Sequence, residues 1–332
     1  MSEMNHQILL ASRPEGAASA ANFRSVQVPL APLADGQVRV RNHYLSLDPY
    51  MRGRMNAKKS YATPQELDAV MVGGTAGVVI ESRHTGWQPG DTVVGGFGWQ
   101  EYGTSDGSGL RKVDATRIPL SAYLGAAGMP GVTAWYGLNQ ICAPRPNETV
   151  AVSAASGAVG SVVGQLAKRH GCRVIGIAGG REKCRYVTEE LGFDACVDYR
   201  EDDLKAGLHA AAPDGVHAYF DNVGGAVLDA VMANMSASGR IAVCGAISGY
   251  DGAPMVMSNP ALILASRLKL QGFIVSEHLE HWPAALQELQ ALLEAGQLHY
   301  RETVAQGLAA APEAFLGLLQ GRNFGKQLVK LV

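Results

Sequence analysis

Cysteine is absent from the chain before Cys142, and the cysteines that follow form no C-x-x-C pair. They are five in number: Cys142, Cys172, Cys184, Cys196 and Cys244. An odd number without such a pair argues against a disulfide framework and favours a reducing compartment. The N-terminal MSEMNHQILLASR has no basic segment followed by an apolar run, and no stretch approaches the roughly 18 apolar residues of a membrane span. We therefore expect a soluble, cytoplasmic protein without a membrane partner.

An excess of charge of either sign is also missing. The 28 Lys and Arg residues nearly balance the 30 Asp and Glu residues, for a net charge of -2. This balance creates no field that would attract nucleic acid, so a small-molecule partner is expected. With 47% hydrophobic and 17% charged residues, the 332-residue chain has the composition of globular protein and room for two domains.

The ligands of a catalytic zinc ion are missing as well. Such a site needs three ligands from Cys, His or acidic residues and one open position. The N-terminal part has no cysteine, and the strand where a His-Glu pair would lie reads GGTAG from Gly73 to Gly77. His278 and His281 are spaced for one face of a helix, where a solvated surface is the simpler interpretation. We predict an enzyme without a metal, and no G-x-S-x-G elbow points to a serine nucleophile.

What is present centres on the stretch from Thr149 to Gly171, TVAVSAASGAVGSVVGQLAKRHG. Its apolar first part predicts a strand buried on both faces, and its last part shows apolar residues at helical spacing. Between them lies A-x-G-x-x-G, formed by Ala155, Gly157 and Gly160. Gly157 allows a pyrophosphate to approach the backbone, and Gly160 allows the helix to lie close to the strand. Ala155, in place of the usual first glycine, requires an ordinary negative φ.

The pattern of strands and helices divides the chain in two. Short strands without intervening helices, from Gln7 to about Val113, predict a small all-β barrel, interrupted by a polar loop over residues 51–72. From about Ser121, two helical pieces broken at Met129-Pro130-Gly131 lead into strands that alternate with helices, which predicts a doubly wound parallel sheet. The tail returns to the first domain. We predict an α/β protein whose barrel domain comprises residues 1–122 and 296–332 and whose nucleotide-binding domain comprises residues 123–295.

The cofactor is indicated where the second strand of the parallel sheet ends. An NAD site usually has an acidic residue there, but this strand runs into Gly179-Gly180 and then Arg181 and Lys183. Two cations can neutralise a 2′-phosphate, which favours NADP over NAD. Glu182 would favour NAD if its side chain pointed into the site.

Hydride transfer without a metal depends on positioning and hydrogen bonding. Reduction of an alkene conjugated to a carbonyl suits this, because hydrogen-bond donors can stabilise the enolate that forms. A tyrosine near the pocket could donate a bond and then a proton. The candidates are Tyr250, Tyr61 and Tyr50, each of which ordinary packing would explain equally well.

Several motifs in fixed order carry a resemblance that runs nearly end to end. They are YLSLDPYMRGRM, VMVGGT, SAASGAVGSVVGQLAKRHGCRVIG, DNVGG, CGAISGY, LQGFIV and GRNFGK. The chain resembles the zinc-independent medium-chain dehydrogenase/reductase proteins, within them the leukotriene B4 12-hydroxydehydrogenase/prostaglandin reductase group. The resemblance implies a GroES-like β-barrel catalytic domain, a Rossmann domain, NADPH and an enone or alkenal substrate. It also implies a homodimer joined edge to edge, plausibly through the strand at residues 268–275.

The same resemblance implies a set of cofactor contacts. Lys183 matches the lysine on the 2′-phosphate, Tyr250 a tyrosine that assists protonation, and Tyr61 one that lines the substrate pocket. With Gly180 and Arg181 added from the end of the second strand, the expected cofactor contacts are Gly157, Ala158, Val159, Gly160, Gly180, Arg181, Lys183, Tyr199, Asn222, Cys244, Gly245, Ala246, Ile247, Ser248, Tyr250, Phe273, Ile274, Val275 and Asn323. The loop from Asn56 to Val70 matches little of the family, which leaves the substrate open.

Two other functions fit the same sequence. One is an NADPH-dependent quinone reductase of the same fold, and the other is a non-catalytic protein that binds NADPH, because a fold alone does not determine function.

Overall fold

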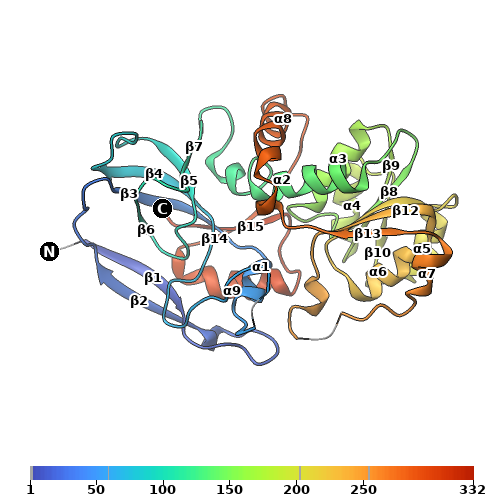
Figure 1. The fold of residues 1–332 in the computed structure, drawn as a ribbon, viewed down its shortest axis with the longest axis horizontal. Helices are drawn as coiled ribbons and strands as arrows, with labels where there is room; N and C mark the ends of the chain where they lie inside the picture. Colours follow the sequence, from blue (N-terminus) through green and yellow to red (C-terminus); the bar gives the residue numbers. More distant parts are fainter. Residues whose placement is uncertain (1–2, 59, 202, 253–254) are drawn as a thin grey trace. The chain divides into compact units, whose positions relative to one another are not determined.

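The computed structural model describes residues 3–58, 60–201, 203–252 and 255–332. The backbone forms two compact units (Figure 1). Unit 1 comprises residues 1–124, 302–323 and 327–332, and unit 2 comprises residues 125–301 and 324–326. The predicted boundary at residue 295 would place residues 296–301 in the first domain. Here they group with unit 2, because Leu298 is buried in its core and the side chain of Gln165 bonds the backbone of His299 in both directions.

Unit 2 contains a six-stranded sheet in the order β10-β9-β8-β11-β12-β13, and every neighbouring pair is parallel. Its strands are β8 (Thr149–Ser153), β9 (Arg173–Ala178), β10 (Ala195–Asp198), β11 (Val216–Asp221), β12 (Met235–Val243) and β13 (Lys269–Gly272). All five residues of β8 are buried, as the absence of a polar face predicts for a central parallel strand. The doubly wound fold predicted from the sequence is therefore confirmed.

Helices cover both faces of this sheet (Figure 1). They are α2 (Met129–Tyr136), α3 (Gly160–Arg169), α4 (Arg181–Glu189), α5 (Leu204–Ala211), α6 (Gly225–Met232), α7 (Ala261–Ala265) and α8 (Trp282–Glu294). A π-helix extends α2 over Gly137–Cys142, and short 3-10 turns lie at Ile247–Gly249, Val275–Glu277 and Leu279–His281.

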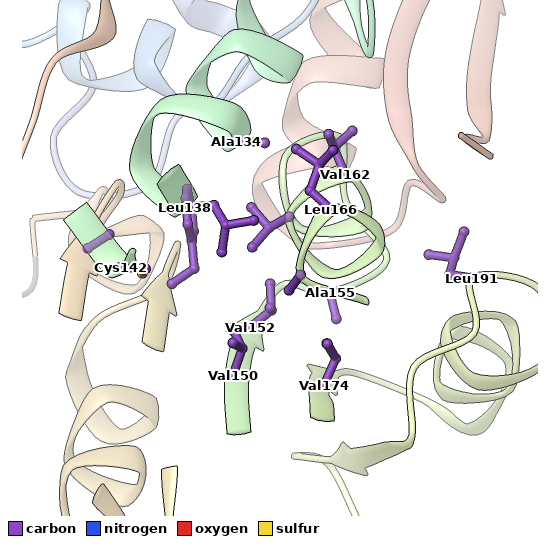
Figure 2. Close-up of a cluster of buried hydrophobic side chains, with 14 of the residues drawn as sticks. Ala134, Leu138, Cys142, Val150, Val152, Ala155, Val162, Leu166, Val174 and Leu191 are labelled. Atoms are coloured by element: carbon purple, nitrogen blue, oxygen red, sulfur yellow. The ribbon is translucent and has the colours of Figure 1, made fainter. Parts of the chain in front are cut away.

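Side chains that alternate along the strands build two separate cores. On β8, Val150 and Val152 join the cluster under α2, α3 and α4, whereas Ala151 joins the cluster under α5 and α6. Figure 2 shows the first cluster, in which Val162 and Leu166 of α3 lie with Ala134 of α2, Val150 and Val152 of β8, and Leu138 and Cys142. The apolar residues of α3 thus pack on one face of the sheet, as their helical spacing in the sequence predicts.

Two details of this unit differ from the prediction. The break expected at Met129-Pro130-Gly131 lies before these residues, and Pro130 is instead the second residue of α2, because proline is tolerated in the first helical turn, where its missing N–H has no partner to lose. His278 and His281 do not share a helix: both rings pack against Tyr136 of α2, with centroid distances of 4.3 and 5.4 Å. The histidines are therefore aromatic packing partners and not a solvated helix face.

Unit 1 is mainly an antiparallel sheet in the order β14-β15-β3-β4-β5-β7, with β6 also paired to β3, and a second sheet of β1 and β2. Its strands are β1 (Met4–Leu10), β2 (Phe23–Pro29), β3 (Val38–Ser46), β4 (Thr75–Ser82), β5 (Thr92–Gly95), β6 (Tyr102–Ser105), β7 (Arg111–Lys112), β14 (Glu302–Gln306) and β15 (Lys326–Lys330). The helices are α1 (Tyr50–Arg54) and α9 (Ala311–Leu319), with 3-10 turns at Ala20–Asn22, Leu120–Leu124 and Leu308–Ala310. The all-β prediction for this region is confirmed.

An aromatic cluster holds α9 against the strands of unit 1. The ring of Phe23 stacks on Trp99 at a centroid distance of 5.3 Å, and Phe315 of α9 meets the edge of both rings. Trp99 lies in the connection between β5 and β6 and is fully buried. The glycines at 95, 96 and 98 allow the intervening backbone to turn Trp99 inward.

Within the described ranges, no helix has both the length and the apolar character needed to cross a membrane.

Candidate functional site

The sheet of unit 2 has a point where its connections reverse direction. β8 pairs with β9 on one side and with β11 on the other, so the chain leaves β8 toward one edge and returns on the opposite side. In such sheets the crevice at the carboxyl ends of these two strands is where ligands bind. The residues that follow β8, β9, β11 and β12 therefore form the candidate site.

The glycine turn after β8 is closed by its own backbone. The N–H of Gly157 donates to the carbonyl of Ala154 at 2.8 Å, and the N–H of Ser161 donates to the carbonyl of Gly157 at 3.0 Å. Ala154 takes the left-handed conformation with φ at 49°, which leaves Ala155 with the ordinary φ that the sequence predicts. A Cβ on Gly160 would lie 2.4 Å from the Ala154 carbonyl oxygen, so only glycine fits this contact.

A buried carboxylate organises the loop after β11. Oδ1 of Asp221 accepts bonds from the N–H groups of Val223 and Gly224 at 3.0 and 2.9 Å and from the hydroxyl of Tyr219 at 2.7 Å. Its neighbour Asn222 joins this loop to β8, because its N–H donates to Ser153 Oγ and its side-chain amide donates to the Ser153 carbonyl, both at 2.8 Å. The predicted contact residue Asn222 thus connects the carboxyl ends of β8 and β11, the two strands that flank the crevice.

The loop after β12 is tied to the same point. The N–H groups of Cys244 and Gly245 donate to the carbonyl of Asp221 at 2.8 and 3.1 Å, and the hydroxyl of Ser248 donates to the carbonyl of Val223 at 2.6 Å. Burial, with the nearby charge of Asp221, raises the pKa of the Cys244 thiol to about 12. Cys244 is therefore protonated at neutral pH and unreactive toward electrophiles.

A basic corner lies at the ends of β9 and β10. Gly180, with φ at 101°, donates its N–H to Asp198 at 2.8 Å and leads directly into α4. Burial, followed by the nearby charge of Arg200, lowers the pKa of Lys183, whereas the charge of Glu182 raises it. A Cβ on Gly179 would lie 2.6 Å from the hydroxyl of Tyr199, which packs over the glycine pair.

Arg181, the other predicted cation, has a different partner. Its guanidinium contacts the carboxylate of Glu201 at 2.8 Å, and 86% of its side chain is exposed. Arg200, which the sequence reasoning did not single out, supplies the second charge beside Lys183. Its signal was present in the sequence, because it follows Tyr199 at the end of the third strand.

Two further groups of predicted site residues are the segment after β13 and the three tyrosines. The ring of Phe273 is buried in the core, 5.4 Å from Tyr136 and 6.2 Å from Phe220 between centroids. The ring of Phe273 is therefore a core side chain of unit 2. The tyrosines divide between the units: Tyr250 follows the 3-10 turn after β12 in unit 2, and Tyr50 and Tyr61 belong to unit 1.

The phenol of Tyr50 is a weak acid in this environment. Burial raises its pKa well above the ordinary value, and the charge of Asp48 raises it further. Tyr61, by contrast, has 59% of its surface exposed.

The segment Phe324–Lys326 is held against the glycine turn by contacts within unit 2. Gly325 forms a parallel bridge with Gly157, and the N–H of Lys326 donates to the carbonyl of Arg301 at 2.8 Å. The Arg301 guanidinium lies 4.5 Å from the ring centroid of Tyr186 and 4.9 Å from that of Phe324, and it contacts Glu190 at 2.5 Å. The predicted contact residue Asn323 belongs to unit 1 and immediately precedes this segment.

These features indicate a protein of the dinucleotide-binding class. A glycine turn at a helix start, a crevice where the strand order reverses and two neighbouring cations form a donor set that fits a phosphorylated dinucleotide. Two family models match, described as "N-terminal domain of oxidoreductase" over residues 6–113 and "Zinc-binding dehydrogenase" over residues 158–291.

Relatives match almost the whole chain. It is 45% identical to NADPH-dependent curcumin reductase of Escherichia coli (99% of this chain, 97% of that protein) and 42% identical to 2-alkenal reductase (NADP(+)-dependent) of Nicotiana tabacum (98% and 97%). The crystal structure of CurA in complex with NADPH from Vibrio vulnificus superposes with a TM-score of 0.94 at 44% identity, covering 98% of this chain and 99% of that one. The chain belongs to the medium-chain dehydrogenase/reductase family, with a GroES-like domain and a Rossmann domain, as the sequence motifs predict.

Proposed function

We propose that this protein is an NADPH-dependent reductase that saturates the carbon–carbon double bond of α,β-unsaturated ketones and aldehydes, a curcumin or alkenal reductase. The observation that carries the proposal is the 45% identity over 99% of the chain to a reductase of this name, on a chain whose basic corner offers two cations to a 2′-phosphate. When bound, NADPH supplies the hydride that adds to the β-carbon of the enone.

The residues of unit 2 have defined parts in this proposal. The turn at Gly157 and Gly160 receives the pyrophosphate, and Lys183 with Arg200 holds the 2′-phosphate under the ring of Tyr199. The loops after β11, β12 and β13 receive the nicotinamide side, with contacts from Asn222, residues 244–250, residues 273–275 and Asn323. Arg181 stays on the periphery, because its ion pair with Glu201 occupies it.

A proton must reach the α-carbon after the hydride has reached the β-carbon. Tyr250 is our first candidate, because it follows the loop that the Asp221 carbonyl anchors. Tyr61 is exposed in the loop of unit 1 and is assigned to the substrate pocket. Burial raises the pKa of Tyr50, so we assign this tyrosine to hydrogen bonding rather than proton donation.

The proposal includes three further points. The reaction uses no metal, because the chemistry needs only hydride transfer and enolate stabilisation by hydrogen bonds. The protein works in the cytoplasm on a small-molecule enone, without nucleic acid or membrane. It forms a homodimer through β13, which is the last strand of its sheet and whose side chains are largely exposed.

The experiment is a product analysis with purified protein and NADPH. An enone such as curcumin and an alkenal should each give the saturated carbonyl compound with one NADPH consumed per double bond. A quinone reductase would give hydroquinone from quinones and leave the enones unchanged. A non-catalytic NADPH-binding protein would quench or shift NADPH fluorescence and turn over neither. Stoichiometric zinc in the active protein would contradict the metal-free reaction.

A further inference from the structure

Two thiols lie side by side behind the basic corner. Sγ of Cys196, in β10, is 2.9 Å from Sγ of Cys184, in α4, and its thiol donates a hydrogen bond to it. None of the five cysteines, all within the described ranges, is in a disulfide, and these two are partly exposed, whereas Cys142 and Cys172 are buried. A disulfide bond is about 2.05 Å long, so the two sulfur atoms need to approach by only about 0.9 Å.

We propose that Cys184 and Cys196 are a modification site: a hydroperoxide oxidises them to an intramolecular disulfide, which weakens the binding of NADPH at the basic corner. The second half of this proposal rests on the proposed function, whereas the first half concerns the two thiols alone.

The surroundings give the two thiols different parts in the oxidation. Cys184 lies near the start of α4, where the helix end stabilises a thiolate, and it accepts the hydrogen bond from Cys196. That hydrogen bond, and then burial, raises the pKa of Cys196, which therefore keeps its proton. Cys184 is thus the thiol that attacks the peroxide, and Cys196 is the thiol that resolves the product.

The chemistry balances without another reductant. The sulfur of Cys184 attacks one peroxide oxygen, the O–O bond breaks, and the products are a sulfenic acid and an alcohol. The sulfur of Cys196 then attacks the sulfenic sulfur, forming the S–S bond and releasing water. Two thiols lose two electrons and two protons, and the hydroperoxide is reduced to the alcohol and water.

The surroundings of Cys142 and Cys172 show why peroxide would oxidise the pair of Cys184 and Cys196 selectively. The thiol of Cys142 faces the carbonyl of Tyr219 at 3.5 Å, and that of Cys172 faces the carbonyl of Arg145 at 3.4 Å. Burial raises the pKa of Cys142 to about 12. These thiols are therefore protonated and bonded to backbone oxygen, not to another sulfur.

The disulfide would join both sides of the basic corner. Lys183 immediately precedes Cys184, and Asp198, Tyr199 and Arg200 closely follow Cys196. The N–H of Cys184 donates to the carbonyl of Gly180 at 3.2 Å, and the N–H of Gly180 donates to Asp198 at 2.8 Å. A shift of Cys184 toward β10 would therefore move Lys183, its neighbour in the chain, and the backbone of Gly180. A displacement of a few tenths of an ångström is enough to alter hydrogen bonds to a phosphate.

The test uses the full-length protein, reduced and then treated with hydrogen peroxide. Peptide mapping without reductant should find residues 184 and 196 cross-linked, with a loss of about 2 Da for the two hydrogens. The NADPH dissociation constant, measured by fluorescence titration before and after oxidation, should rise at least about threefold and return with dithiothreitol.

Three variants serve as controls. Cys184→Ser and Cys196→Ser should form no cross-link, and peroxide should leave the NADPH affinity of each where it was before treatment. In Cys196→Ser, a sulfenic acid at Cys184 should be trapped by dimedone. The matched variant Cys172→Ser keeps both thiols of the pair and should cross-link as the parent protein does.

The outcomes separate the proposals. Absence of the cross-link in the parent protein would overturn the modification site. A cross-link without a change in the NADPH dissociation constant would overturn its coupling to the cofactor. A reduced protein that fails to bind NADPH at all would instead refute the proposed function, whatever the peptide map shows.

Discussion

Lys183 provides the sharpest test of the cofactor site, because its environment differs from that of Arg181 only two residues away. Lys183 is half-buried, and Arg200 is near enough to lower its pKa further. Arg181 is exposed and paired with Glu201. If the 2′-phosphate binds at the basic corner, replacing Lys183 and replacing Arg181 should have different consequences.

The size of the effect follows from the bond that is lost. Lys183→Ala removes a charge-assisted hydrogen bond to phosphate, which we expect to weaken NADPH binding by about 1–3 kcal/mol, or about 5- to 150-fold. NADH has no 2′-phosphate, so its affinity should be unchanged. Arg181→Ala removes only an exposed ion pair and should change either affinity by no more than about threefold.

The assay is a titration of each variant with NADPH and with NADH, followed by intrinsic and nucleotide fluorescence. Arg200→Ala should weaken NADPH binding in the same selective way, since it removes the second cation of the corner. Equal losses for both nucleotides in Lys183→Ala would mean that the lysine supports the fold and not the phosphate. A larger loss in Arg181→Ala would refute our reading of the ion pair.

Further predictions concern the loops and the core. Tyr250→Phe should lower kcat with an enone more than it changes the NADPH dissociation constant, and an unchanged kcat would remove this tyrosine from proton transfer. Asp221→Asn should destabilise unit 2 by about 1–3 kcal/mol in urea, because the three bonds to Oδ1 lose their charge assistance and the new NH₂ group would lie where Oδ2 is buried without a hydrogen-bond partner among the described residues; equal stability would show that the loop is held by other contacts. Gly164→Ala should cost about 1–3 kcal/mol, since its Cβ would lie 1.8 Å from the ring of Phe193, whereas Gly53→Ala, with open space around it, should be nearly neutral. Iodoacetamide should leave Cys244 unlabelled at pH 7 and label it as the pH approaches the raised pKa of about 12; rapid labelling at pH 7 would contradict its burial.

Much of the fold could be predicted because the local signals agree with the tertiary structure. The run from Thr149 to Ser153 has no polar face, and the structure buries it on both sides. The helical spacing after Gly160 matches the face of α3 that covers the sheet. Where two signals competed, the prediction was wrong: the Pro130 that reads as a helix break is also a good first-turn residue, and it lies in the first turn of α2.

The individual partners of charged side chains could not be predicted in the same way. Arg181 and Lys183 look equivalent along the chain. The segment after β10, which lies beside α4 in the fold, places Glu201 next to Arg181 and Arg200 near Lys183. The ring of Phe273 lies in a matching motif, yet packing against Tyr136 and Phe220 turns it into the core.

The sequence alone thus determined the doubly wound sheet, the position of the glycine turn and the basic character of the cofactor corner. These depend on residue type and on period along the chain, which a sequence displays directly. Only the tertiary structure decided which cation lies near Lys183, that Gly325 bridges to Gly157, and that Cys184 and Cys196 lie in contact. Such contacts join residues from separate elements, and their geometry exists only after the strands have taken their order in the sheet.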